Sequence, residues 1–151
     1  MLADSQIALL IELADKKVNH AGVMLANQRR QHTEASLQLK QLYEYQHEYY
    51  QKMSASLIDK GMRNRDLQIY QTFIEALNKV IARQTQQVAM CDSHLGHAVD
   101  AWRKEKRQLD AFMVLQQRVR AEKTLTERRQ EQKALDEWAQ RTAGGRDRYG
   151  N

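Results

Sequence analysis

The sequence predicts an all-α fold in which two long helices form an antiparallel coiled-coil hairpin. Three observations support this prediction. The 151 residues include no proline and only six glycines. Apolar residues recur with a seven-residue period in two long segments, and the one clear turn signal lies between them. With 28% charged residues and a mean hydropathy of -0.78, the chain is typical of long helices rather than of an αβ domain.

We expect the first helix to cover about residues 4–57, with Asp4 or Ser5 as its N-terminal cap. Two heptad positions of this segment are apolar except at three polar residues, and such a repeat indicates a left-handed coiled-coil seam. One position carries Ile7, Ala14, Ala21, Gln28, Ala35, Leu42 and Tyr49, and the other carries Ile11, Val18, Leu25, His32, Leu39, Gln46 and Met53. The polar members, Gln28, His32 and Gln46, are expected to fix the register.

A turn is predicted at about residues 58–64, because Gly61 can end a helix and Asn64 can cap the next one. The second helix should cover about 65–142, where Gly144–Gly145 stops it and leaves a frayed tail at 143–151. Its seam positions are Leu67, Ile74, Ile81, Val88, Leu95, Trp102 and Leu109, together with Tyr70, Leu77, Gln84, Cys91, Ala98, Glu105, Phe112 and Val119. We treat the whole chain as a single coiled-coil domain.

The two seams end together if the chain folds back at Gly61. In that arrangement Ile7 faces Gln116, the first helix ends opposite Val119, and the heptad repeat of the second helix also stops at Val119. This agreement favours a hairpin over a parallel dimer, which would require Gly61 to be helical. Residues 120–142 should then overhang as an unpartnered helix. Apolar residues such as Leu125, Leu135 and Trp138 mark this overhang as a binding segment.

The residue pattern does not predict an enzyme, and no cofactor or metal is expected. Cys91, His94 and His97 lie three residues apart on one helix, so they fan across a wide arc instead of converging on an ion. No Gly-rich loop could cradle a phosphate, and a two-helix rod lacks the concave pocket that chemistry requires. A single cysteine and the absence of a long apolar run predict a cytosolic protein.

The charge pattern favours protein partners over nucleic acid. The net charge is +5, but the basic residues are mostly interleaved with Glu and Asp, as on a solvated coiled-coil face. Tyr45, Tyr49, Phe73 and Leu77 should meet across the two helices and build a partly exposed aromatic and aliphatic patch. Such a patch can bind a partner, and it can also simply shield the seam; the residues alone leave both interpretations open.

Four segments resemble the FliJ family of flagellar export proteins. They are 42–49 (LYEYQHEY), 70–77 (YQTFIEAL), 101–104 (AWRK) and 127–141 (ERRQEQKALDEWAQR). The resemblance covers about residues 10–141. It implies a cytosolic coiled-coil component of the flagellar type III export apparatus, associated peripherally with the inner membrane through protein partners. One partner is the hexameric export ATPase, which the protein would bind in the manner of the central stalk of a rotary ATPase. The others are the inner-membrane export gate protein and the export chaperones that the family recycles.

The resemblance also implies where two of these partners bind. The gate-binding pattern of the family falls on Gln38, Leu42, Tyr45, Tyr49, Phe73, Leu77, Val80 and Gln84; the last two depart from its alanine and histidine. The ATPase ring would receive the overhang through Leu125, Arg128, Lys133, Leu135 and Trp138. The alternative is a generic coiled-coil adaptor, or a parallel homodimer with a basic surface.

Overall fold

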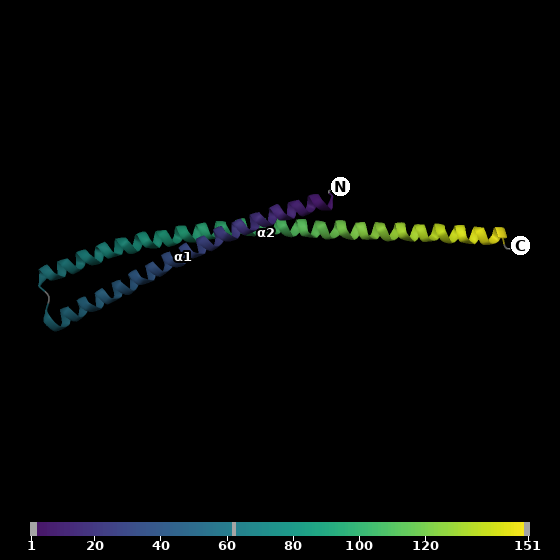
Figure 1. Ribbon diagram of the computed structural model, residues 1–151. Coiled ribbons are helices and arrows are strands. Elements are labelled where there is room, and N and C mark those ends of the chain that lie inside the picture. Colours follow the sequence, from purple (N-terminus) through teal and green to yellow (C-terminus); the bar gives the residue numbers. More distant parts are fainter. Residues whose placement is uncertain (1–2, 62, 150–151) are drawn as a thin grey trace. The chain divides into compact units, whose positions relative to one another are not determined.

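The protein consists of two long α-helices (Figure 1). The structure, a computed structural model, describes residues 3–61 and 63–149, without the side chains of 59–60 and 145–149. Helix α1 spans Asp4–Lys60 and helix α2 spans Asn64–Tyr149. The helices pack against each other and the described residues contain no strand, which confirms the predicted helical hairpin. None of the described helices is long and apolar enough to cross a membrane.

Gly61 breaks the helix between α1 and α2, as predicted. Its φ of 57° lies in the left-handed region, which costs glycine little because it has no Cβ. The predicted cap at Asn64 is wrong by one residue: the carbonyl of Arg63 accepts the N–H of Leu67 at 3.1 Å, so Arg63 is the N-cap. Helix α1 also continues to Lys60, beyond the predicted end at residue 57. Met62 in the predicted turn lies outside the described residues.

The N-terminus of α1 is capped one residue earlier than predicted. The carbonyl of Ala3 accepts the N–H groups of Gln6 and Ile7 at 3.0 and 3.1 Å, which makes Ala3 the N-cap in place of Asp4 or Ser5. The side chain of Gln6 reaches back and accepts the N–H of Ala3 at 2.9 Å. This is the glutamine half of a capping box.

The C-terminal end of α2 differs from the prediction. The helix runs through Gly144–Gly145 to Tyr149, so residues 143–149 are not the predicted tail, and 150–151 lie outside the described residues. A helical glycine costs only about 1 kcal/mol relative to alanine. Gly61 is the one glycine in the described part that adopts a positive φ.

The chain divides into two units, Val18–Lys104 and Met1–Lys17 with Glu105–Asn151. In each unit, segments of α1 and α2 run antiparallel. Every predicted seam position from Ile7 to Met53 and from Leu67 to Val119 is buried or partly buried, so the predicted seams are confirmed. The most buried are Leu25, Ala35, Ile74, Leu77, Ile81 and Cys91 in the first unit, and Ile7, Ala14 and Leu109 in the second.

The start of α1 lies beside Arg120 of α2. Asp4 forms an ion pair with Arg120 at 3.5 Å, whereas residues 121–141 of α2 are all exposed. In Figure 1 the yellow end of α2 continues past the start of α1. The unit that contains both ends therefore has the predicted overhang, because α1 starts beside Arg120 and does not extend along the last part of α2.

Candidate protein-binding surface

Four aromatic side chains gather across α1 and α2 near the turn, in the unit Val18–Lys104. Tyr49 stacks on Phe73 with ring centroids 4.1 Å apart, and Tyr45 meets the same ring edge-on at 6.0 Å. Tyr70 lies 5.2 Å from Tyr49, and Tyr45 lies 6.3 Å from it. We call Tyr45, Tyr49, Tyr70 and Phe73 the aromatic cluster. The predicted meeting of Tyr49 with Phe73 is confirmed, and the cluster holds these rings in place before any partner arrives.

The other residues of the predicted gate-binding set divide between surface and interior. Gln84 donates to the carbonyl of Ala35 at 3.0 Å and to Oε1 of Gln38 at 3.2 Å, which joins the helices at one end of the set. Val80 is 45% exposed. Leu77, in contrast, is only 6% exposed, and Leu42 is partly buried. The structure thus brings the set together, but it places Leu77 in the seam and not on the surface.

The hydroxyl of Tyr49 titrates above the normal range. Burial against the neighbouring rings raises the pKa of Tyr49 above its usual 10.0, and the nearby hydroxyls of Tyr70 and Tyr45 raise it further. Tyr49 is therefore neutral at physiological pH, and its ring can act as an apolar contact with a polar edge.

Two features near the cluster are not predicted by the heptad pattern. The first is Tyr70, which was assigned only to the seam. The second is an open, shallow surface on α2 lined by Arg65, Gln68, Ile69, Thr72, Phe73 and Ala76, which we call the α2 face. Phe73 belongs to both the aromatic cluster and the α2 face. Ile69 is 59% exposed. It lies four residues before Phe73, and residues at this spacing share one helix face, so the spacing alone indicates that the two side chains lie together.

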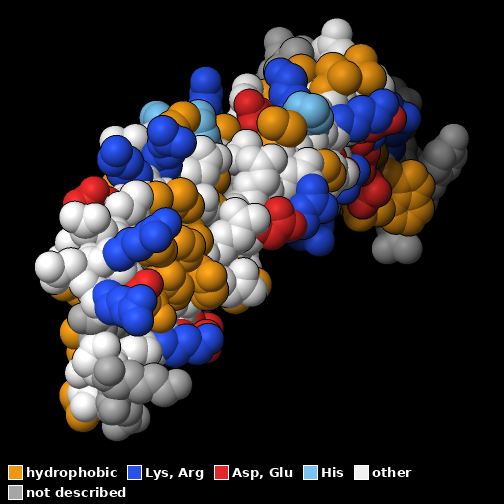
Figure 2. All heavy atoms as spheres, turned by 90° about the vertical axis from the view of Figure 1, so that its left-hand side faces the viewer, with side chains coloured by type: hydrophobic (Ala, Val, Ile, Leu, Met, Phe, Trp, Pro, Cys, Tyr) orange, Lys and Arg blue, Asp and Glu red, His pale blue; other side chains and the backbone are white. Residues whose placement is uncertain are grey.

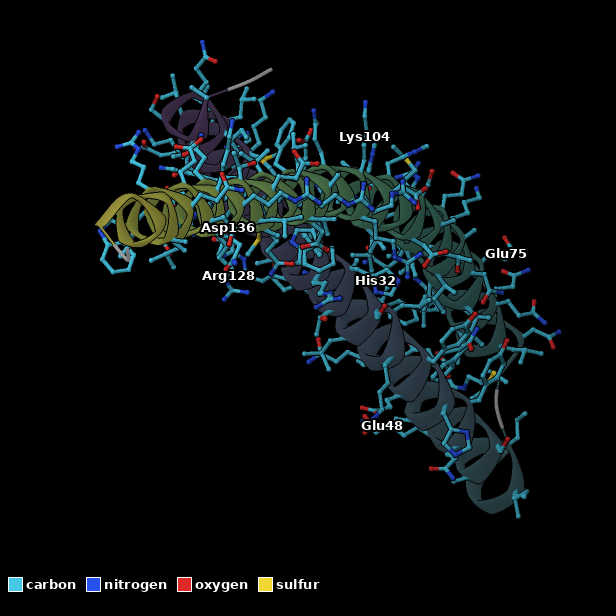
Figure 3. The ribbon with its side chains drawn as sticks, turned by 90° about the vertical axis from the view of Figure 1, so that its right-hand side faces the viewer. His32, Glu48, Glu75, Lys104, Arg128 and Asp136 are labelled. Atoms are coloured by element: carbon cyan, nitrogen blue, oxygen red, sulfur yellow. The ribbon has the colours of Figure 1, made fainter. Side chains whose placement is uncertain are left out.

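The overhang presents its predicted binding residues to solvent. Leu125, Leu135 and Trp138 are 48%, 61% and 67% exposed, and Arg128 and Lys133 are exposed too. Arg128 and Asp136 project outward from this part of α2 in Figure 3. Leu135 and Trp138 lie three residues apart and share one helix face, which makes the overhang a candidate binding surface.

Gln46 and His32, two of the three polar residues of the α1 seam, contact α2. Gln46 donates to Oδ1 of Asn78 at 2.6 Å, and Nε2 of His32 lies 3.5 Å from Oδ1 of Asp92. Oε1 of Gln28 is buried without a hydrogen-bond partner among the described residues. Each contact joins residues that face each other in the predicted register, and a shift by one turn would separate them.

The side chains of Cys91, His94 and His97 diverge. Cys91 is buried in the seam, where Nε2 of Gln87 approaches its sulfur at 3.8 Å, while both histidines are exposed. In the part of the chain that the structure describes, no three His, Cys, Asp or Glu side chains are grouped so that they could hold a metal ion. Cys91 contributes to the seam as a small apolar side chain.

Comparison with known proteins gives a consistent result. The family model described as "Flagellar FliJ protein" matches residues 4–148. The flagellar FliJ protein of Escherichia coli (strain K12) is 36% identical to the chain over 143 residues, which cover 95% of this chain and 97% of the relative. The flagellar FliJ protein of Salmonella typhi is 35% identical over 143 residues with the same coverage. The matches extend over the aromatic cluster and the overhang alike.

Proposed function

Because the chain belongs to the FliJ family of flagellar proteins, we propose that it serves the flagellar export apparatus as a protein-binding component. In this proposal the overhang enters the ring of the hexameric export ATPase, promotes its assembly, and acts as its central stalk. The surface around the aromatic cluster binds the export gate protein, and the chain hands export chaperones back for another cycle. It works in the cytoplasm, at the inner-membrane face of the flagellar base.

The observation that carries the ATPase part of the proposal is the exposure of the overhang. Residues 121–141 extend beyond the start of α1, and Trp138 and Leu135 are more than half exposed. A helix of this kind is marginal without a partner and gains stability when its apolar side chains are covered. The bore of a ring would cover such a helix on all sides.

The test is hydrolysis of ATP by the cognate export ATPase, titrated with the purified chain, while light scattering follows the oligomeric state. We expect faster hydrolysis and a hexamer carrying one copy of the chain. Replacing Trp138 and Leu135 together by alanine should weaken this effect at least tenfold, about 1.4 kcal/mol of binding. Ile58→Ala is the matched control, because Ile58 is 82% exposed but lies at the turn. Equal loss in both variants would contradict the assignment to the overhang.

The gate part of the proposal is supported by the preorganised aromatic cluster. Its test is the affinity of the chain for the purified cytoplasmic region of the gate protein. Tyr45→Ala should weaken binding at least tenfold, because Tyr45 is half-exposed and rests against Phe73. Tyr43→Ala is the control: both tyrosines are 49% exposed, but Tyr43 lies two residues away on the other side of α1. Identical affinities for the two variants would refute the gate surface.

A further inference from the structure

A small apolar cleft lies between α1 and α2 in the unit that contains both chain ends. It measures about 160 Å³ and is lined by Leu10, Leu13, Ala14 and Lys17 of α1 and by Gln108 and Phe112 of α2. We call it the terminal cleft. Leu13 is 48% exposed, and Leu9, one helical turn earlier and 57% exposed, extends the apolar surface. None of these residues belongs to the gate-binding set or to the ATPase-binding set.

The acidic residues of α1 point away from the terminal cleft. In residues 3–17 they are Asp4, Glu12 and Asp15. Asp4 and Asp15 lie on the opposite side of α1 from Leu13, as the helical repeat requires. Glu12 is paired with Lys16 at 3.8 Å. Lys17 lines the cleft, and none of the ion pairs between described side chains includes it.

The flank of α2 that borders the terminal cleft carries a second cation. Arg118 lies on the same flank as Gln108, ten residues or roughly 15 Å farther along the helix. It is exposed, and it too is absent from the ion pairs of the described part of the chain. Glu122 lies one turn beyond Arg118, farther from the cleft. Lys17 and Arg118 therefore stand at opposite ends of the apolar surface.

The remaining acidic residues near the cleft are in the seam or already paired. In residues 105–118 of α2 they are Glu105, which is a partly buried seam residue, and Asp110, which pairs with Lys106 at 3.4 Å. On the face of the molecule that Figure 2 presents, acidic and basic side chains are interspersed. An apolar cleft between two cations is therefore a distinct feature of the surface, and its charge is complementary to an acidic partner.

The shape of the cleft favours a helix as its occupant. The backbone groups of α1 and α2 are bonded within each helix, so they cannot pair with an extended peptide as the edge of a sheet would. A helix lying along the cleft could cover Leu9 and Leu13 with its apolar side. Carboxylates about three turns apart on its edge would reach Lys17 and Arg118.

We propose that the terminal cleft binds an acidic amphipathic helix of an export chaperone. This inference rests on the proposed function, in which the chaperone is the one partner without an assigned surface. A chaperone that is handed back for another cycle has to dissociate readily. A small apolar contact gives modest affinity, and cations at its ends accelerate association, so the terminal cleft suits a partner that exchanges quickly.

The first test is a titration of the full chain with a purified cognate export chaperone. Lys17→Glu combined with Arg118→Glu should weaken binding at least tenfold at low salt, and the difference from wild type should shrink as salt is added. Arg129→Glu combined with Arg141→Glu is the matched control. It changes the net charge by the same amount, but both residues are exposed on the overhang, beyond the cleft. This control should stay within twofold of wild type.

The second test addresses the apolar part of the cleft. Leu13→Gln keeps the length of the side chain but removes its apolar surface, and it should weaken chaperone binding at least fivefold. Met113→Gln is the matched control, because Met113 is 46% exposed but lies on the opposite flank of α2 from Gln108. It should stay within twofold. Circular dichroism should show unchanged helix content in both variants, because both residues are exposed.

The outcomes separate this inference from the function on which it rests. If wild type does not bind the chaperone, the chaperone part of the proposed function and the terminal cleft both fail. If wild type binds and the cleft variants bind equally well, the chaperone function stands and the cleft is excluded as its site. Loss of ATPase stimulation in Leu13→Gln with chaperone binding retained would assign the cleft to the ring instead. A dimer of the free chain that Leu13→Gln dissociates in light scattering, with chaperone binding retained, would assign it to a second copy.

Discussion

Leu77 provides the sharpest test of how the aromatic surface is built. Leu77 belongs to the proposed gate-binding set, yet its side chain is only 6% exposed and packs in the seam. A buried side chain can influence a partner only through the surface that it supports. We therefore expect Leu77→Ala to change the stability of the hairpin and not its intrinsic affinity for the gate.

The size of the effect follows from the burial. Leu→Ala substitutions in well-packed cores cost about 2.7–5 kcal/mol, and the cost falls where the surroundings can close over the cavity. A seam between two helices is open at both flanks, so we expect the lower end, about 2–3 kcal/mol. Val80→Ala removes two methyl groups that are nearly half exposed. Because a fully buried group contributes about 0.8 kcal/mol, two half-buried groups should cost the hairpin roughly 0.8 kcal/mol of stability.

Two measurements check the expectation. Thermal unfolding followed by circular dichroism should show Leu77→Ala melting about 4–12 °C below wild type, at about 2–4 °C per kcal/mol for a chain of this size. The affinity for the gate region should stay within twofold of wild type at a temperature where both proteins are fully helical. An unchanged melting temperature would refute the seam placement of Leu77. A tenfold loss of affinity in the fully helical variant would show that Leu77 contacts the partner directly.

Three further predictions follow from the contacts described above. Removing residues 121–151 should lower the total helical signal. The free energy of unfolding in urea should stay within about 0.5 kcal/mol of that of the full chain, because the exposed residues 121–141 do not pack on α1. A larger loss would mean that the overhang supports the hairpin. His32→Leu should stabilise the hairpin by about 1 kcal/mol, because it places an apolar side chain in the seam. The contact that is lost is weak, since the side chain of its partner, Asp92, is 75% exposed. A lower stability in urea would show that the contact with Asp92 contributes more than the apolar packing. Above pH 10 the wild type should lose stability faster than Tyr49→Phe. Burial raises the pKa of Tyr49 in the folded chain, so the unfolded chain releases that proton at a lower pH. Rising pH therefore stabilises the unfolded state relative to the folded state. Melting curves between pH 8 and pH 11 that run parallel for the two proteins would contradict this reasoning.

Much of the fold could be predicted from the sequence because coiled-coil packing is periodic. Each seam residue follows from its place in a heptad, and the end of the pairing at Val119 followed from chain length and the position of Gly61. The helix ends were less predictable. The two caps each differed by one residue, and α2 passed through Gly144–Gly145. Local propensities at a helix end differ by about 1 kcal/mol or less, so they do not decide between neighbouring positions.

The sequence by itself determined the fold class, the turn, the two seams and the existence of an unpaired C-terminal segment, because each depends on spacing along one chain. Only the tertiary structure decided which side chains of the aromatic region are accessible. It placed Leu77 in the interior, added Tyr70 to the cluster and left Ile69 exposed beside Phe73. Accessibility depends on how side chains from two helices fill the space between them, and that packing depends on rotamers and ring contacts that a heptad position does not specify.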